Sequence, residues 1–311
     1  MSSTTHEQFE PHRGRLMALA YRMLGSVADA EDAVQDTFIK WQKVDGADIA
    51  APEAWLVTAC SRRCIDMLRE ARRHRETYVG PWLPEPVLGE SDILWPGGAS
   101  VPEARPDAHL EAAESLTMSF MLLLERLSPA ERAAFLLHDV FDYPFDQIAA
   151  MLGKTSAACR KLAERARGHV RETRPRFEVK HQDAYRILGQ MFEAARRGDL
   201  DGVTSLLSED AELWSDGGGK VVAARRVLHG APRIAHFLCA INAARQHYPH
   251  STEISFREVN GMPGAVGVTR TPGEPPQVEF VLSLEFDEGQ ILKIHNVRNP
   301  DKLGHVQSQL D

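Results

Sequence analysis

Residues 145–167 carry the pattern that most restricts what this chain can fold into. A short apolar segment is followed by Gly153 and then by a basic segment with helical spacing. Gly153 permits a sharp turn, and either Thr155 or Ser156 can cap the amides that open the second helix. Two short helices joined in this way indicate a helix-turn-helix, a pattern that is only moderately specific by itself.

The charge of the second helix favours DNA as its partner. Cys159 and Leu162 should face inward, which leaves Arg160 and Lys161 outward near the helix start. Outward side chains at that position of a recognition helix reach base edges in duplex DNA. Residues 154–176 hold eight Lys or Arg against two acids, while the whole chain has a net charge of −8. A local basic stripe on an acidic protein favours contact with phosphates that depends strongly on salt.

The overall composition indicates a soluble globular protein of two or three domains. The chain has 311 residues, of which 43% are hydrophobic and 26% are charged. No apolar stretch approaches the ~20 residues of a membrane span, and the N-terminus lacks a signal-peptide layout, so we expect a cytoplasmic protein without membrane association. Cys60 and Cys64 lie one helical turn apart, which fits a redox pair or, as we prefer, two buried side chains. No spacing indicates a metal site or a cofactor.

The hydrophobic pattern divides the chain into four segments. Residues 7–77 have helical periodicity, interrupted by a loop from Val44 to Pro52. Residues 78–107 are rich in proline, glycine and acidic side chains, which predicts a stiff linker. Helical periodicity returns in residues 108–176. Residues 178–311 predict an α+β domain, with helices at about 181–197, 199–207 and 230–243 and strands at about 210–215, 252–260, 264–271, 277–287 and 289–298.

Two of the predicted N-terminal helices carry charged faces. An acidic face with Asp29, Asp32 and Asp36 lies on one of them. The other helix, predicted for residues 53–74, is rich in arginine, and Asp66 can brace two arginines that point at a nucleic-acid backbone. The residues on that basic face are Arg62, Asp66, Arg69 and Arg73. Taken alone, both faces also fit ordinary solvated helix surfaces.

The order of three motifs carries a family resemblance. The first is Asp29–Phe38, the second is Trp55–Arg69, and the third is Leu127–Arg132 followed by the helix-turn-helix. In this order and spacing they resemble the bacterial extracytoplasmic-function (ECF) sigma factors over roughly residues 7–175. The resemblance implies two all-α modules, a region 2 helical bundle at 7–77 and a region 4 helix-turn-helix at 108–176. It also implies docking on the β′ clamp and the β flap of core RNA polymerase, and binding to promoter DNA.

The resemblance assigns roles to three groups of residues. Contact with core polymerase falls to Asp29, Asp32, Gln35 and Asp36. Capture of the melted minus-10 strand falls to Arg62, Arg63, Asp66, Arg69, Arg72 and Arg73. Recognition of the minus-35 duplex falls to Lys154, Thr155, Ser156, Arg160, Lys161, Arg165 and Arg167.

Residues 178–311 depart from the family's usual length. Their order of helices and strands resembles the SnoaL-like fold, an α+β cone whose interior could take Trp214, Phe237, Phe256, Phe280 and Phe286. Three further motifs resemble the sigma-factor group that carries a fused SnoaL-like domain. They comprise Trp82, Leu83, Pro84, Glu85 and Pro86; Asp216, Gly217, Gly218, Gly219 and Lys220; and Asn299, Pro300, Asp301, Lys302 and Leu303. This resemblance implies contacts with the sigma modules, with the domain acting as an attached regulator.

The same fold serves pocket enzymes, which gives a second hypothesis. Asp216, His229, His236 and His295 are the candidate bases for a cyclase or isomerase. The spacings establish no carboxylate–histidine pair, so we expect no enzyme and favour mechanical control, or sensing of a small-molecule ligand in the C-terminal pocket. A third hypothesis is a ligand-responsive repressor that binds duplex DNA unaided.

Overall fold

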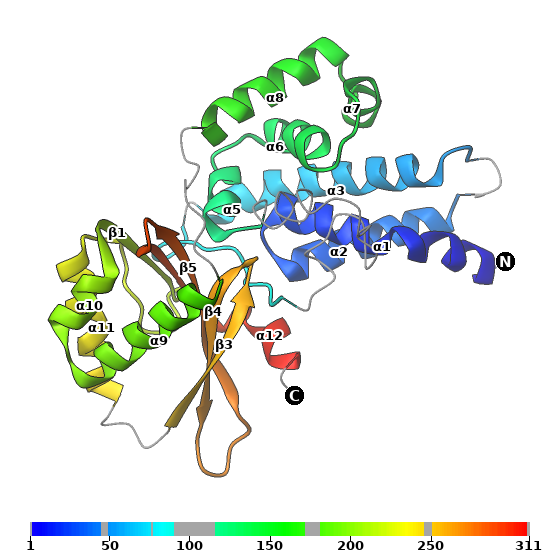
Figure 1. Ribbon diagram of the computed structural model, residues 1–311. Helices are drawn as coiled ribbons and strands as arrows, with labels where there is room; N and C mark the ends of the chain where they lie inside the picture. Colours follow the sequence, from blue (N-terminus) through cyan, green and yellow to red (C-terminus); the bar gives the residue numbers. More distant parts are fainter. Residues whose placement is uncertain are drawn as a thin grey trace. The chain divides into compact units, whose positions relative to one another are not determined.

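The computed structural model describes residues 2–44, 49–75, 77–89, 116–171, 181–245 and 251–309 (Figure 1). The described chain forms two compact units. Residues up to Thr77 and those from 116 to 171 make the first unit, whereas residues 78–89 join the residues from 181 onward in the second. Part of the expected linker therefore belongs structurally to the C-terminal unit.

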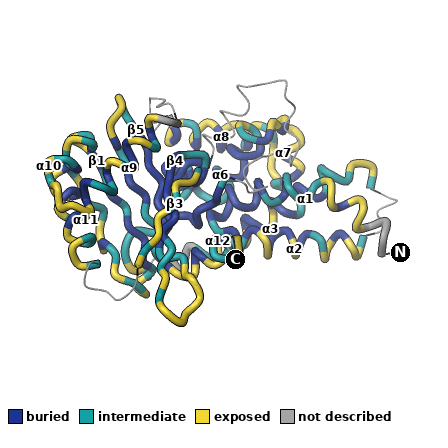
Figure 2. The backbone as a smooth tube through the Cα atoms, turned by 60° about the horizontal axis from the view of Figure 1, so that its bottom comes forward, coloured by how far each residue is buried: buried dark blue, intermediate teal, exposed yellow. Residues whose placement is uncertain are grey.

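The first unit begins with three helices, and the break between the second and third falls at the predicted loop, of which residues 45–48 lie outside the described residues. They are α1 (Ser2–Leu24), α2 (Val27–Gln42) and α3 (Pro52–Arg75). Ser26 caps α2 by accepting a hydrogen bond from the Asp29 amide at 3.1 Å. Buried residues line the inward faces of these helices (Figure 2). Among them Trp41 is fully buried, and its ring centroid lies 5.3 Å from that of Trp55. Cys60 and Cys64 are buried free thiols, as preferred above.

The helix-turn-helix is confirmed in the second half of this unit. Its elements are α5 (Met118–Leu124), α6 (Pro129–Phe135), the π-helix η3 (Leu136–Val140), α7 (Phe145–Leu152) and α8 (Ser156–Arg171). Gly153 ends α7 in the left-handed conformation with φ of 62°, which favours glycine. Of the two candidate caps, Thr155 opens α8 by accepting from the Ala158 amide at 3.2 Å. Cys159 and Leu162 face inward as predicted.

The second unit is the α+β cone that the resemblance predicts. Its helices are α9 (His181–Arg197), α10 (Leu200–Leu206), α11 (Ala231–Arg245), the 3-10 helix η4 (Pro300–Lys302) and α12 (Gly304–Ser308). Its strands are β1 (Leu207–Asp216), β2 (Leu228–His229), β3 (Ser251–Val259), β4 (Met262–Arg270), β5 (Gln277–Asp287) and β6 (Gln290–Val297). They form one sheet in the order β2-β1-β6-β5-β4-β3, in which β1 and β6 are parallel and the other neighbours are antiparallel.

The core of this unit corrects part of the predicted interior. Phe280 and Phe286 lie in the buried cluster between the sheet and helices α9–α11, and Phe237 packs against it. Phe256 is 46% exposed on the edge strand β3, so it is not an interior residue. Trp214 alternates with buried Leu213 along β1 and therefore points to the opposite face of the sheet. The prediction that all five aromatic side chains fill the interior is therefore wrong for Trp214 and Phe256.

None of the described helices is long and apolar enough to cross a membrane. The described residues also contain no group of His, Cys, Asp or Glu side chains that could hold a metal ion.

Candidate nucleic-acid interface and linker site

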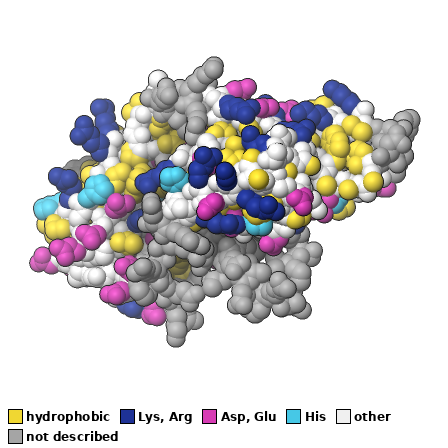
Figure 3. All heavy atoms as spheres, turned by 90° about the horizontal axis from the view of Figure 1, so that it is seen from above, with side chains coloured by type: hydrophobic (Ala, Val, Ile, Leu, Met, Phe, Trp, Pro, Cys, Tyr) yellow, Lys and Arg dark blue, Asp and Glu magenta, His cyan; other side chains and the backbone are white. Residues whose placement is uncertain are grey.

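The exposed face of α8 concentrates positive charge. Lys154 and Thr155 are exposed at the turn, and Arg160 and Lys161 are exposed one turn into the helix. Figure 3 shows Lys and Arg side chains gathered on the face of the molecule that carries α8. Ser156 is half-buried, and its hydroxyl donates to Asp146 at 2.5 Å, so it helps to hold α7 and α8 together.

The structure divides the basic residues expected to contact minus-35 DNA into two sets. Arg165 pairs with Glu131 at 3.0 Å, and Arg167 pairs with Asp139 at 2.7 Å. Arg160 and Lys161 have no ion-pair partner in the described part of the chain, although the Arg160 guanidinium lies 5.6 Å from the Phe145 ring centroid. Arg160 and Lys161 are therefore the cations that can contact DNA without first breaking an internal ion pair.

One of the arginines of α3 has a partner that the sequence did not predict. Asp66 accepts from Arg69 at 3.0 Å, but Arg62 turns away from Asp66. Instead, the Arg62 Nε donates to the carbonyl oxygen of Met151 at 2.8 Å. Of the arginines on this face, Asp66 therefore braces Arg69 and not Arg62. The side chains of Arg72 and Arg73 lie outside the described residues.

One ion pair joins two of the expected sites. Arg63 of the predicted minus-10 set donates to Asp36 of the predicted polymerase-binding set at 2.7 Å. Both side chains are partly exposed. A charge change at either position will therefore alter both candidate surfaces.

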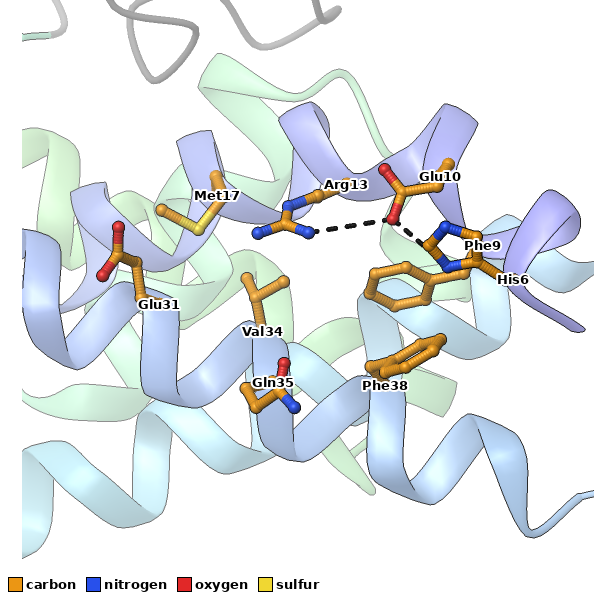
Figure 4. Close-up of a pocket in the computed structure, with 9 residues that line it drawn as sticks. All are labelled: His6, Phe9, Glu10, Arg13, Met17, Glu31, Val34, Gln35 and Phe38. Carbon is orange, nitrogen blue, oxygen red and sulfur yellow. Dashed lines mark ion pairs between the residues drawn. The ribbon is translucent and has the colours of Figure 1, made fainter. Parts of the chain in front are cut away.

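A small hollow lies beside the acidic residues of α2 and was missed from the sequence. It has a volume of about 80 Å³ between α1 and α2, and Figure 4 shows Phe9 and Phe38 at one side of it. Their ring centroids lie 4.8 Å apart. Glu10 binds Arg13 across the rim, and Gln35 of the expected polymerase site forms part of the lining. The recurrence of Phe9, Arg13 and Met17 every four residues on α1 was the signal that could have revealed it.

In the second unit, residues 78–89 form an extended strap. The strap begins at the C-terminal end of β1, where the Asp216 carboxylate is fully buried. That carboxylate accepts from the Tyr78 hydroxyl at 2.6 Å, the Leu83 amide at 2.9 Å and the Lys302 ammonium at 2.7 Å. Leu83 and Lys302 belong to two of the three motifs, and Tyr78 lies four residues before the first of them. One buried carboxylate therefore binds residues from each of these segments.

Lys302 is the cation that balances this carboxylate. Its ammonium group also donates to the Leu83 carbonyl at 2.5 Å and lies 4.3 Å from the Trp82 ring centroid and 5.0 Å from that of Tyr78. The Asn299 amide donates to the Tyr78 hydroxyl at 2.9 Å. Burial, together with the hydrogen bond to Asp216, raises the pKa of Tyr78 well above its usual value, so the phenol stays a donor.

The three consecutive glycines after Asp216 allow close approach. A Cβ atom at Gly218 would clash with the Asn299 amide group, and the φ of Gly218 is +59°. A Cβ atom at Gly217 would meet the Val221 carbonyl at 2.7 Å. Lys220 pairs with Asp301 on the surface at 2.6 Å. The turn therefore brings the segment 216–220 against the segment 299–303 without side chains in between.

The far end of the strap is held by the turn between β3 and β4. The Val87 amide donates to the Asn260 side chain at 2.9 Å, and the Asn260 amide donates to the Val87 carbonyl at 2.8 Å. A His305 ring nitrogen lies 2.5 Å from the Pro86 carbonyl. Tyr78, Asn260 and His305 were not predicted from the sequence, because none of them lies in the three motifs. Tyr78 belongs to the strap itself, whereas only the fold brings Asn260 and His305 to it.

The candidate bases for an enzyme do not form a common site. Asp216 is engaged by the strap, His236 is exposed on α11, and His229 faces Glu212 at 3.3 Å on the opposite edge of β1. His295 is fully buried, and its ring nitrogens have no hydrogen-bond partner among the described residues. It pairs in register with Ser283, so it faces away from the cluster beneath helices α9–α11.

Burial lowers the pKa of His295 to about 4. In the unfolded chain, His295 has an ordinary pKa near 6.5. Between about pH 4 and 6.5 it is therefore protonated in the unfolded chain and neutral in the folded one. We expect the unfolding free energy to fall by up to about 3 kcal/mol as the pH drops through that window. Above pH 7, His295 should add no pH dependence to it. Denaturation titrations of the protein and of His295→Gln at pH 7.5 and 5 test this, because the variant should lose less stability at pH 5. Equal losses would contradict it.

Two family models match the first unit. Residues 8–74 match sigma-70 region 2, and residues 117–170 match sigma-70 region 4. These spans coincide with helices α1–α3 and with the part of the chain that holds the helix-turn-helix.

Relatives match nearly the whole chain. The ECF RNA polymerase sigma factor SigJ of Mycobacterium tuberculosis is 36% identical over 95% of this chain and 92% of that protein. The probable ECF RNA polymerase sigma factor SigI of the same species is 30% identical over 96% of this chain and 94% of that protein. The crystal structure of M. tuberculosis SigJ matches with a TM-score of 0.69 and 34% identity, covering 96% of this chain and 97% of that one. The chain belongs to the ECF RNA polymerase sigma factors, as the resemblance indicated.

Proposed function

We propose that this alternative sigma factor binds core RNA polymerase and directs it to promoters through separate surfaces of region 2 and region 4. The observation that carries the proposal is the exposed basic face of α8, with Arg160 and Lys161 unengaged by described acids. A rigid helix with this charge fits the major groove of the minus-35 duplex. Arg62, Arg63 and Arg69 of α3 would contact the melted minus-10 strand.

Contact with the polymerase would use the acidic side of α2. Asp32 and Gln35 are exposed there, and Gln35 borders the hollow that Phe9 and Phe38 line. Acidic side chains next to a small apolar recess suit a basic partner helix, which matches docking on the β′ clamp. Region 4 would dock on the β flap.

The C-terminal unit would control activity through the strap. The strap follows α3 after only two residues, and it is part of the chain that joins region 2 to region 4. While Asp216 and Lys302 hold it, this stretch cannot extend along core polymerase between the two regions. Binding and release of the strap by the C-terminal unit would therefore control how far apart region 2 and region 4 can lie on the polymerase, without a separate regulatory protein.

The C-terminal unit would act without catalysis. The carboxylate of Asp216, the acidic candidate base, already accepts four hydrogen bonds, from the Tyr78 hydroxyl, the Leu83 and Gly218 amides and the Lys302 ammonium, which is about as many as its two oxygens can take. A general base needs a free lone pair within reach of its substrate. We therefore assign Asp216 to positioning the strap.

Run-off transcription with bacterial core RNA polymerase on the gene's own upstream region tests the function. We expect initiation that depends on this protein, and output that changes when the chain is cut after Arg176, because the strap then loses its seat. The matched template with a scrambled minus-35 element is the control. Absence of both initiation and core binding would contradict the proposal.

A further inference from the structure

Arg62 binds the end of a helix in the other sigma region. Its guanidinium donates to the carbonyl oxygens of Met151 at 2.8 Å and Ala150 at 3.2 Å. Both carbonyls belong to the last turn of α7, which ends at Leu152. The last four carbonyls of a helix have no partner within it and carry the negative end of the helix dipole. Arg62 of region 2 therefore supplies the positive charge that the end of α7 in region 4 lacks.

The same arrangement recurs at two other places between these regions. Arg15 of α1 donates to the Phe141 carbonyl at 2.9 Å, just after η3 ends. In the opposite direction, Arg132 of α6 donates to the Met23 carbonyl at 2.6 Å, in the last turn of α1. Three arginines thus connect region 2 and region 4 through carbonyl groups at helix ends.

Tyr143 adds a polar bridge beside Arg15. Its hydroxyl donates to Glu53 of α3 at 2.8 Å and accepts from Arg15 at 3.2 Å. Burial raises the pKa of Tyr143 to about 12; the nearby charge of Arg15 lowers it, and the hydrogen bond to Glu53 raises it. The hydroxyl therefore keeps its proton, and the bridge persists at neutral pH. We call Arg15, Arg62, Glu53 and Tyr143 the latch.

The latch is of a kind that can open. Arg62 is exposed, and the side chain of Arg15 is 28% exposed, whereas Arg132 is 2% exposed. Water can replace carbonyl groups at exposed guanidinium groups, so the net free energy of such hydrogen bonds is modest. Arg132 lies in the interior, and its contacts are expected to break last.

We propose that in the free protein Arg62 holds region 4 against region 2 through the terminal carbonyls of α7, and that single-stranded promoter DNA competes for the same guanidinium. This inference rests on the proposed function, because it takes Arg62 as a contact to the minus-10 strand. Carbonyl oxygens and nucleic-acid oxygens are acceptors of the same kind for arginine. The closed and DNA-bound states exclude each other at Arg62. Every group of the latch lies in the sigma regions, so the closed state does not require the C-terminal unit.

The test measures the separation of the two regions in the full chain. Spin labels at Gln42→Cys and Gly168→Cys report it, since both positions are exposed and the native cysteines are buried. A Cβ atom at Gly168 meets no atom within 4 Å. The double variant Arg15→Ala/Tyr143→Phe weakens the latch without touching Arg62. The matched control is Arg126→Ala, which removes an exposed arginine of region 4 that belongs neither to the latch nor to a proposed binding surface.

We expect one short distance in the unaltered protein and a longer one when core polymerase and the non-template minus-10 strand are added. In the double variant, the ratio of open to closed protein should rise about tenfold, with a matching gain in affinity for the strand, while Arg126→Ala leaves the ratio unchanged. Circular dichroism confirms that the variants fold. A wild-type distance that stays short with the strand bound, or a folded double variant with the wild-type ratio, would overturn the latch. Failure of run-off transcription would instead contradict the proposed function, because the latch is judged on the measured distances, with and without the strand, and not on transcription.

Discussion

Lys302→Met is expected to release the strap and to lower the unfolding free energy of the C-terminal unit by about 3–5 kcal/mol. The Lys302 side chain is 9% exposed and that of Asp216 is fully buried, so loss of the cation leaves an uncompensated charge in the interior. Methionine keeps the length of the side chain against Trp82 and Tyr78, which separates the charge from the packing. Chemical denaturation measures the loss, and limited proteolysis within residues 78–89 reports release of the strap.

Lys220→Met is the matched control within the same set of motifs. Lys220 also pairs with an aspartate, Asp301, but the two side chains are 55% and 61% exposed. Exposed pairs contribute at most about 1 kcal/mol, so this variant should keep both its stability and its protease resistance. Similar behaviour of the two lysine variants would show that the buried charge pair does not hold the strap.

Control by the strap gives the two variants different transcription phenotypes. If seating of the strap limits the reach of the sigma regions, Lys302→Met should change run-off output in the same direction as the cut after Arg176. Lys220→Met should match the unaltered protein. A folded Lys302→Met protein with wild-type output would separate the structural role of the charge pair from regulation.

Local signals predicted most of the fold. Gly153 and the candidate caps Thr155 and Ser156 indicated the helix-turn-helix, because a left-handed C-terminus and a hydroxyl cap depend on neighbouring residues in the sequence. The five predicted strands overlap β1, β3, β4, β5 and β6, because alternation and turns mark them locally. The two-residue strand β2 has too short a pattern to be recognised.

The site depended on pairings between distant residues, which periodicity does not encode. The motifs at 82–86, 216–220 and 299–303 were grouped by family resemblance, and their convergence on one buried carboxylate became visible only in the fold. The partner of Arg62 lies 89 positions away at Met151, so helix spacing suggested Asp66 instead. Sequence patterns identified the charged groups, but tertiary contacts determined which of them are engaged.

The basic side chains of α8 fall into an unpaired set and an ion-paired set, and we expect the two sets to differ in their effect on promoter binding. Arg160→Ala combined with Lys161→Ala should weaken promoter binding by the polymerase complex by about 2–6 kcal/mol, the sum of two contacts of about 1–3 kcal/mol each. Arg165→Ala combined with Arg167→Ala removes the same charge from the same helix. Because those two side chains already pair with Glu131 and Asp139, their removal should weaken binding far less.

Salt dependence separates this prediction from a general effect of charge. If Arg160 and Lys161 bind phosphates, their removal should reduce the slope of log binding constant against log salt by about one for each phosphate that is no longer neutralised. The Arg165/Arg167 variant should keep the original slope, because its cations remain neutralised within the protein in both states. Equal affinities and slopes for the two double variants would mean that DNA responds to the total charge of α8. Unequal affinities and slopes would mean that the internal ion pairs of region 4 determine which basic side chains contact the promoter.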